Sequence, residues 1–347
     1  MATVIDRPAH SGSRPRPRFA SLIEPLPLRL PPGKSLGPAI ASARAPNGDL
    51  WILHHGRVSP DDPTDYLPHV VRFSPDFAFI GAWGGADHVP AVDGVSQWPA
   101  GPEGLECDAE GNLWVFGYQP GDSAVLKLSP SGELLLRIGQ RGRPGNDDDT
   151  MLLGDGATTC YHDVGNREVF VSDGYGNHRV IAFNSDTGQF TRMWGAYGKR
   201  PSELSPDESF GNPVHKVARG PNGRIYVCDR IKCRVQEFEL VPGGARFMRE
   251  VMIAPGTQQF GSAFDLAFAP DGEFLYVADG INQRVWSVDL DSFAVLGWSS
   301  AQLASEGEDN VPAYHKLLHR FSIEPNGDLI LACTIGGFRR LKFVGVE

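Results

Sequence analysis

HKVARGPNGRIYVC, residues 215–228, carries the pattern that decides the fold. A short apolar run leads into a polar turn that usually contains Asn-Gly or Asp-Gly, and an apolar strand-like run follows. Such turns tolerate the tight dihedrals of a β-hairpin. The same pattern occurs six times: IASARAPNGDLWIL (40–53), EGLECDAEGNLWVF (103–116), TCYHDVGNREVFVS (159–172), HKVARGPNGRIYVC (215–228), FDLAFAPDGEFLYVA (264–278) and HRFSIEPNGDLILA (319–332).

Further strand-like runs follow each hairpin, so that one repeat contains four. In the second repeat they are GLECDAE, GNLWVFG, AVLKLSP and ELLLRIG, between residues 104 and 139. Long stretches with helical periodicity are absent, which predicts an all-β fold. A repeat of about 50 residues with four strands is typical of a β-propeller. The sequence therefore predicts a six-bladed β-propeller with four-stranded blades.

The two ends of the chain complement each other. The sixth repeat ends after FRRLKFVGV and lacks a fourth strand. The N-terminal run FASLIEPLPLRL (19–30) can supply that strand and close the ring. We therefore expect one propeller domain over residues 19–347. The Pro, Arg and Ser content of residues 1–18 predicts a mobile N-terminal tail.

Composition limits the class of protein. The formal net charge is −10 and the pI is about 5.5, whereas a nucleic-acid-binding face needs basic residues. No apolar run approaches the ~18 residues of a membrane span, and the N-terminus has no apolar core of secretory type. Five cysteines without zinc-ribbon spacing are expected as reduced thiols. We therefore expect a cytoplasmic protein without nucleic-acid or membrane partners, and no segment indicates an oligomeric state.

Alternate repeats place metal-ligand residue types at one position. Aligned on the turn, the first residues are Ile40, Glu103, Thr159, His215, Phe264 and His319. The innermost strands of a propeller line a central channel and start at the same end, so these positions form a ring at one mouth. Glu103, His215 and His319 should then converge on the axis. Two imidazoles and a carboxylate with open positions form a plausible catalytic metal site.

Each of these three residues also has a simpler interpretation. A lone histidine near a strand start is usually a hydrogen-bonded surface or channel residue, and a glutamate at a channel mouth can be solvated. The case for a metal depends on three symmetric positions on alternate repeats. Zinc suits this ligand set best, although iron and manganese also use two histidines and one carboxylate.

The repeats resemble NHL repeats, and most of the repeat region is similar to the peptidyl-α-hydroxyglycine α-amidating lyase family. The closest stretch is REVFVSDGYGNHRVIAF (167–183); LWILHHGR (50–57), PEGLECDAEGNLWV (102–115) and VCDRIKCRVQEF (227–238) match further segments in order. This resemblance implies a six-bladed propeller whose catalytic zinc is held by three histidines, with a tyrosine and arginines at the substrate. The family splits a carbinolamide into an amide and glyoxylate.

Carried over by this resemblance, His215 and His319 fall on two of the zinc histidines, and Glu103 falls on the third. The catalytic tyrosine falls on Tyr175, and one substrate arginine falls on Arg230.

Two family positions differ in this sequence. His55, in His54-His55-Gly56, replaces the second substrate arginine, and the sequence leaves open whether Arg57 serves instead. Arg320 stands where the family has a calcium-binding carboxylate, so calcium is not expected there.

These residues predict a metal-dependent lyase or hydrolase, related to amidating lyases, that acts on a small hydroxylated or carbonyl-containing substrate. Tyr175 would act as a phenolate base, and Arg230 would stabilise the phenolate and bind a substrate carboxylate. His54 or His55 would transfer a proton. The simpler alternatives are that Tyr175 caps a turn and that Arg230 pairs with Asp173, Asp229 or Asp279.

Two other functions remain open from the sequence. One is a non-catalytic NHL propeller that binds a protein or ligand on one face. The other is non-haem iron redox chemistry at the Glu/His/His site.

Overall fold

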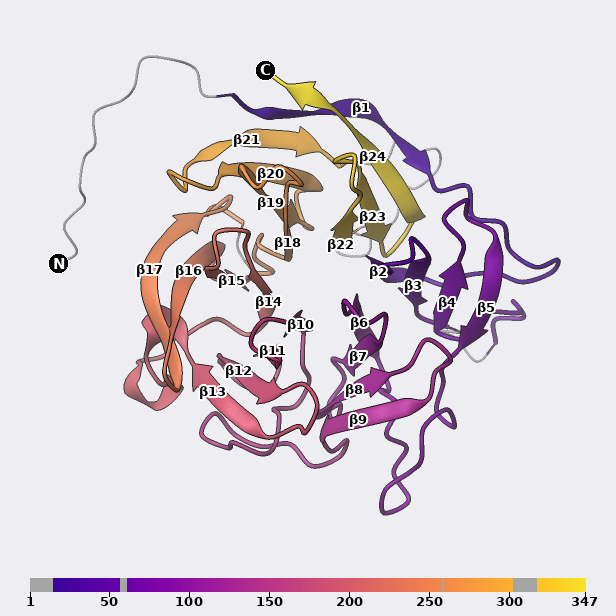
Figure 1. Ribbon diagram of the computed structural model, residues 1–347, viewed down its shortest axis with the longest axis horizontal. Helices are drawn as coiled ribbons and strands as arrows, with labels where there is room; N and C mark the ends of the chain where they lie inside the picture. Colours follow the sequence, from indigo (N-terminus) through magenta and orange to yellow (C-terminus); the bar gives the residue numbers. More distant parts are fainter. Residues whose placement is uncertain (1–14, 57–60, 258, 302–316) are drawn as a thin grey trace.

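The computed structural model describes residues 15–56, 61–257, 259–301 and 317–347. Within these ranges, strands β1 to β24 form six four-stranded antiparallel sheets. The sheets stand around a central channel, with one strand of each sheet innermost and one on the perimeter (Figure 1). The predicted all-β, six-bladed propeller is confirmed.

The strands follow the chain from the channel outward in each blade. Blade 1 contains β2 (Ala39–Arg44), β3 (Leu50–His54), β4 (Val70–Phe73) and β5 (Phe79–Trp83); blade 2 contains β6 (Pro102–Cys107), β7 (Leu113–Gly117), β8 (Ala124–Leu128) and β9 (Leu134–Gly139). Blade 3 contains β10 (Thr159–Asp163), β11 (Glu168–Asp173), β12 (Arg179–Asn184) and β13 (Phe190–Trp194). Blade 4 contains β14 (Val214–Arg219), β15 (Ile225–Asp229), β16 (Arg234–Val241) and β17 (Gly244–Met252). Blade 5 contains β18 (Asp265–Phe268), β19 (Phe274–Asp279), β20 (Arg284–Asp289) and β21 (Val295–Ser300).

Blade 6 is built from both ends of the chain. Its three inner strands are β22 (Leu318–Ile323), β23 (Leu329–Cys333) and β24 (Gly337–Val346), and β1 (Pro17–Pro25) pairs antiparallel with β24. Pairing of the two terminal segments supplies the fourth strand of this blade and joins the two ends of the chain in one sheet. The expected closure by the N-terminal segment is therefore confirmed, with the strand starting at Pro17.

Helical structure is minor in this fold. Two 3-10 helices, η1 (Ala196–Gly198) and η2 (Pro201–Glu203), lie in the connection between blades 3 and 4. Within the described residues, no helix has the length and hydrophobicity that crossing a membrane requires.

The hydrophobic core lies between neighbouring blades. Each of the six buried apolar clusters in the described residues joins two adjacent sheets. One position in the second strand of each repeat enters a different cluster: Trp51, Trp114, Phe170, Tyr226, Tyr276 and Ile330. All six side chains are at most 2% exposed. The Leu-Trp-Val-like motif is thus repeated because every blade must bury one face against the next.

Candidate metal centre

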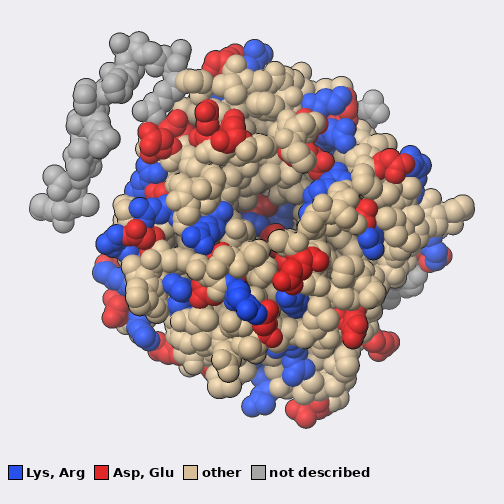
Figure 2. Space-filling model, in the orientation of Figure 1, with Lys and Arg blue, Asp and Glu red and all other residues tan. Residues whose placement is uncertain are grey.

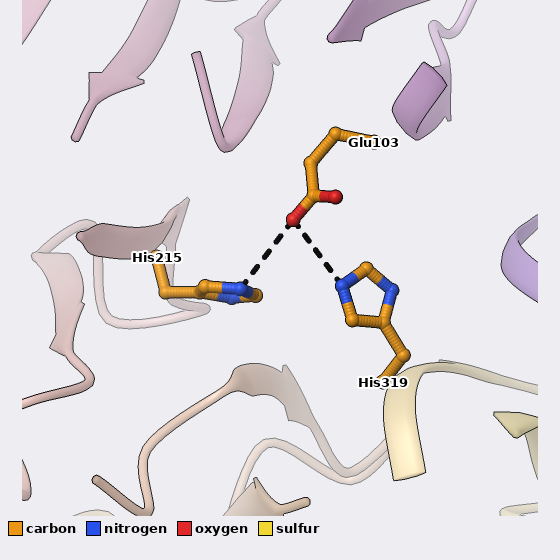
Figure 3. Close-up of side chains that lie close together, drawn as sticks. All are labelled: Glu103, His215 and His319. Carbon is orange, nitrogen blue, oxygen red and sulfur yellow. Dashed lines mark hydrogen bonds and ion pairs between the residues drawn. The ribbon is translucent and has the colours of Figure 1, made fainter. Parts of the chain in front are cut away.

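Glu103, His215 and His319 converge in the channel from β6, β14 and β22 (Figure 3). Glu103 Oε1 lies 3.2 Å from His319 Nε2 and 3.6 Å from His215 Nε2, and all three potential ligand atoms lie within 4.8 Å of one another. A tetrahedral zinc ion with bonds of about 2.0–2.2 Å separates its ligand atoms by roughly 3.3–3.6 Å. The spacing therefore suits a single ion.

A β-bulge positions each of the three side chains. Pro102 pairs with Gly117 and Gly104 with Phe116, so Glu103 is an extra residue opposite the neighbouring strand. The same shift in register falls on His215 in β14 and on His319 in β22. A bulge interrupts the alternation of a strand and redirects one side chain. The three potential ligands are thus directed toward the axis by the same local device.

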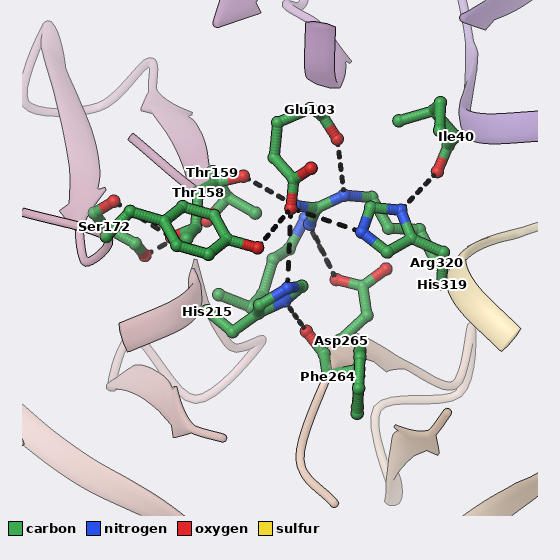
Figure 4. Close-up of polar contacts among 12 residues, drawn as sticks. Ile40, Glu103, Thr158, Thr159, Ser172, His215, Phe264, Asp265, His319 and Arg320 are labelled. Carbon is green, nitrogen blue, oxygen red and sulfur yellow. Dashed lines mark hydrogen bonds and ion pairs between the residues drawn. The ribbon is translucent and has the colours of Figure 1, made fainter. Parts of the chain in front are cut away.

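Main-chain carbonyls of the following blades fix both imidazoles (Figure 4). His215 Nδ1 hydrogen bonds to the carbonyl of Phe264, and His319 Nδ1 lies 2.9 Å from the carbonyl of Ile40. A carbonyl oxygen only accepts, so each Nδ1 carries the hydrogen. In the neutral ring each Nε2 then presents a lone pair to the centre, as a metal ligand requires.

The charge and burial of the centre fit a bound cation. The three side chains are 0–7% exposed, and His215 Nε2 has no hydrogen-bond partner within the described residues. Burial, together with the nearby Arg320, lowers the pKa of His215 well below its usual value. Burial opposes ionisation of Glu103, but His319, Arg320 and Arg230 hold its pKa below the usual range. A carboxylate and two lone pairs aimed at one point are stabilised by a cation between them.

Beneath the centre, Arg320 joins several blades across the channel (Figure 4). Its Nε donates to the carbonyl of Glu103 at 3.2 Å, and its Nη2 donates to the carbonyl of Thr158 at 2.5 Å. Nη1 lies 3.8 Å from Asp265 Oδ1, which is also 3.6 Å from Lys216 Nζ. Figure 2 shows the central hollow of one face with acidic and basic side chains in its depth. A guanidinium thus occupies the position where the family resemblance implied a carboxylate.

Tyr175 adjoins the centre from the loop after β11. Its hydroxyl donates to Glu103 Oε1 at 3.2 Å. Its main chain is held on both sides, since its N–H donates to Gly156 and its carbonyl accepts from Asn212. Burial, and then the carboxylate of Glu103, raise the pKa of Tyr175 above its usual value. Burial and the neighbouring carboxylate thus both disfavour the phenolate form of Tyr175.

Arg230 follows β15 and faces the same region. Its guanidinium carbon lies 4.9 Å from the centre of the Phe264 ring, and no ion pair joins it to a carboxylate among the described residues. The three aspartates considered as partners bind elsewhere: Asp173 to Arg179, Asp229 to Arg234, and Asp279 to Asn282 and Trp286. The charge of Arg230 therefore remains available to an anionic group.

The two histidines of blade 1 have different surroundings. His54 is fully buried: Nδ1 accepts from the N–H of Gly37, and Nε2 lies 3.0 Å from the carbonyl of Pro68. His55 Nε2 lies 2.8 Å from the carbonyl of Pro102, the residue before Glu103. The main chain thus occupies both nitrogens of His54, whereas His55 lies beside the centre. Arg57 lies outside the described residues.

Several groups of the site had no separate signal in the sequence. The carbonyls of Ile40 and Phe264 orient the histidines, although the apolar side chains at these two ring positions offer no metal ligand. Main-chain groups leave no mark on residue type. The positions directly after two ligands, Lys216 and Arg320, are both cationic, and that shared pattern could have indicated a charged second layer.

Comparison with known proteins gives relatives of two kinds. No protein-family model matches the chain. The chain is 31% identical over 183 residues to a mouse peptidyl-glycine alpha-amidating monooxygenase, and the match covers 52% of this chain but 17% of that protein. It is 24% identical over 305 residues to human NHL repeat-containing protein 3, covering 86% and 76% of the two chains. The chain spans about a fifth of the length of the amidating monooxygenases, and its homologues include both kinds of protein.

Solved structures agree on the fold. The periplasmic gluconolactonase of Pseudomonas aeruginosa superposes with a TM-score of 0.54 at 16% identity, covering 89% of this chain and 88% of the other. A streptogramin B lyase superposes with a TM-score of 0.54 at 10% identity, covering 94% and 98%. Both are similar in architecture at identities that establish the fold alone.

Proposed function

We propose that this protein is a metal-dependent lyase or hydrolase that acts on a small hydroxylated or carbonyl-containing molecule at the mouth of the channel. The observation that carries the proposal is the pair of imidazoles whose Nδ1 atoms are fixed by carbonyls, so that their Nε2 lone pairs converge with Glu103. The similarity to amidating monooxygenases supports an enzyme. The donor set of two histidines and one carboxylate fits zinc best, with iron or manganese as alternatives.

The chain's own residues take distinct roles in this proposal. Glu103, His215 and His319 hold the ion, which supplies Lewis acidity to a substrate oxygen or to water. The hydroxyl of Tyr175, 3.2 Å from Glu103 Oε1, donates a proton to a developing oxyanion or leaving group. The resulting phenolate then acts as a base and takes a proton back. Arg230 binds a carboxylate or another anionic oxygen of the substrate.

Metal content and turnover test the proposal together. Wild-type protein purified without added metal should contain about one equivalent of a divalent ion. His215→Ala and Glu103→Ala should each lose it, whereas His178→Ala, whose histidine pairs with Asp147, should keep it. If both ligand variants retain a full equivalent of metal, Glu103 and His215 are not metal ligands and the proposed site is wrong. Metal analysis after anaerobic purification separates zinc from iron.

The reaction class requires its own assay. A panel of small lactones, esters and α-hydroxy amides should show turnover that a chelator abolishes and zinc restores. Tyr175→Phe should lower kcat by about 10²–10⁴-fold without loss of metal. Zinc-loaded protein that turns over no member of these classes would favour the second function below.

A non-catalytic NHL propeller is the second candidate. The match to NHL repeat-containing protein 3 supports it, because this match extends over 86% of the chain. In that case, Arg230→Ala and Tyr175→Phe would change no turnover, and a protein or ligand would bind one face of the ring.

We also propose a cytoplasmic location. All five cysteines are free thiols, and four of them are buried: Cys160, Cys228, Cys233 and Cys333. Unpaired buried thiols persist in reducing compartments. Fractionation of cells that express the tagged protein tests this, and recovery outside the cytoplasm would contradict it.

A further inference from the structure

A second cavity lies beside the metal centre, between blades 1 and 2. Its volume is about 220 Å³, which accommodates one planar group of a small molecule and lies below the range of about 300–1,000 Å³ typical of sites that hold a whole drug-sized ligand. Its lining residues are His55, Gly56, His69, Ala100, Gly101, Pro102, Tyr118 and Gln119. We refer to it as the blade 1–2 pocket.

The pocket and the metal centre share neighbouring residues. Pro102, in the pocket wall, directly precedes Glu103, and its carbonyl binds His55 Nε2 at 2.8 Å. The Tyr118 ring lies 5.8 Å from that of Tyr175, whose hydroxyl contacts Glu103. The wall of the pocket is therefore joined to the centre through Pro102 and Tyr118.

The two histidines of the pocket have assigned tautomers. The indole N–H of Trp98 donates to His69 Nδ1 at 2.8 Å, so the hydrogen of the neutral ring is on Nε2. His55 Nε2 bonds to a carbonyl, so its hydrogen is on Nε2 and its Nδ1 is an acceptor. Among the described residues, neither His69 Nε2 nor His55 Nδ1 has a hydrogen-bond partner. Gln119, in the same lining, has an amide that can both donate and accept a hydrogen bond.

The described residues of the lining offer hydrogen bonds and flat ring surfaces. Among the described residues that line the pocket there is no Lys, Arg, Asp or Glu. Burial, together with His54 and His55, lowers the pKa of His69 to about 4, and burial lowers that of His55. The rings of His55 and Tyr118 are stacked, with centroids 6.2 Å apart and planes 16° apart. A charged group would find no counter-ion among the described residues of this lining.

We propose that the blade 1–2 pocket determines substrate specificity, and that it takes a planar, uncharged group with both a hydrogen-bond donor and an acceptor, as in a primary carboxamide. Assigning this group to a substrate rests on the proposed function. The binding preference itself rests on the lining of the pocket. His69 Nε2–H donates to the carbonyl of the group, His55 Nδ1 accepts from its N–H, and Tyr118 packs beside its plane.

Benzamide and benzoate test the preference, because they share a shape and differ in charge. Calorimetric titration should show that the full-length protein binds benzamide at least about tenfold more tightly than benzoate, since a partly desolvated carboxylate finds no counter-ion among the described lining residues. His55→Arg should reverse the order by adding a cation. Gln119→Lys adds a cation from the other wall and should also reverse it. His178→Arg, whose histidine pairs with Asp147, is the matched control and should change neither affinity.

The outcomes separate this inference from the proposed function. Histidine ring signals of His55 and His69 should shift with benzamide in NMR spectra, with or without zinc, while that of His178 stays fixed. Such a result supports the pocket even if the protein binds no metal. Equal binding of benzamide and benzoate, or no binding of benzamide by zinc-loaded protein, would contradict the proposed preference of the pocket. Neither result would affect the proposal of a metal centre. If His55→Arg does not fold, the relative affinity of Gln119→Lys for benzamide and benzoate tests the proposed preference instead.

Discussion

Replacement of Arg320 with methionine should destabilise the fold strongly. The wild-type guanidinium donates to the buried carbonyls of Glu103 and Thr158 and adjoins Asp265. Hydrogen bonds from a charged group contribute about 1.5–3 kcal/mol each, and removal of one partner of a buried ion pair costs about 3–5 kcal/mol. Because these contributions overlap, we expect Arg320→Met to lower the free energy of unfolding by about 3–5 kcal/mol.

Urea denaturation followed by circular dichroism measures this loss. Arg320→Lys keeps the charge but cannot donate in two fixed directions, so it should lose about half as much. Arg246→Met is the matched control, because that arginine pairs with Glu239 at the surface with 64% of its side chain exposed. An exposed pair contributes about 0–1 kcal/mol. The control should therefore remain close to wild type.

The same variant should affect metal binding in the opposite direction. Arg320 Nη2 lies 3.6 Å from Glu103 Oε1, where its positive charge opposes an incoming divalent cation. Loss of that charge should tighten zinc binding by about tenfold or more, as measured by competition with a chromogenic chelator. A stability loss below about 1 kcal/mol would refute the reasoning, because the two carbonyls would then have been left buried at almost no cost.

Three further predictions concern the ligands, the ring and pH. Glu103→His should keep about one equivalent of metal, whereas Glu103→Gln should lose most of it; equal metal in both variants would show that residue 103 is no ligand. Deletion of residues 1–25 removes β1 from blade 6 and should lower the melting temperature by several degrees in calorimetry; an unchanged value would mean that the ring closes without it. The pKa of His69 is lowered to about 4, so the unfolded chain takes up its proton first as the pH falls from about 6.5. This histidine should therefore cost up to about 3 kcal/mol of stability between pH 6.5 and 4. In urea titrations, the difference in free energy of unfolding between wild type and His69→Gln should change with pH in that range and stay constant above it.

The repeat made most of the fold accessible from the sequence. Each hairpin can be recognised in the sequence from its turn residues and its apolar second strand, because turn geometry and strand formation depend on residues within a few positions. Trp51, Trp114 and Tyr226 mark the faces that pack between blades. Alignment of the repeats also brought Glu103, His215 and His319 to one ring, since equivalent residues of a closed array share one height on its axis.

Other parts of the site had no such periodic signal. The blade 1–2 pocket combines His55, Tyr118 and His69. His55 and Tyr118 stand at equivalent positions after the second strands of blades 1 and 2, but their residue types differ, so the repeat gives no signal for a shared site. Arg320 appeared in the sequence only as a departure from a family position. Its partners, the carbonyls of Glu103 and Thr158, are main-chain groups that any residue could supply.

The sequence by itself determined the number of blades, the order of their strands and the three residues that face the axis, because these follow from local turns and from repetition. Only the tertiary structure decided how those residues are aimed. The bulges at Glu103, His215 and His319 lie between the first and second strands of their own blades. The carbonyls of Ile40 and Phe264 that set both imidazole tautomers belong to the neighbouring blades. Contacts between main-chain groups far apart in the chain depend on the closed ring, and residue identity does not encode them locally.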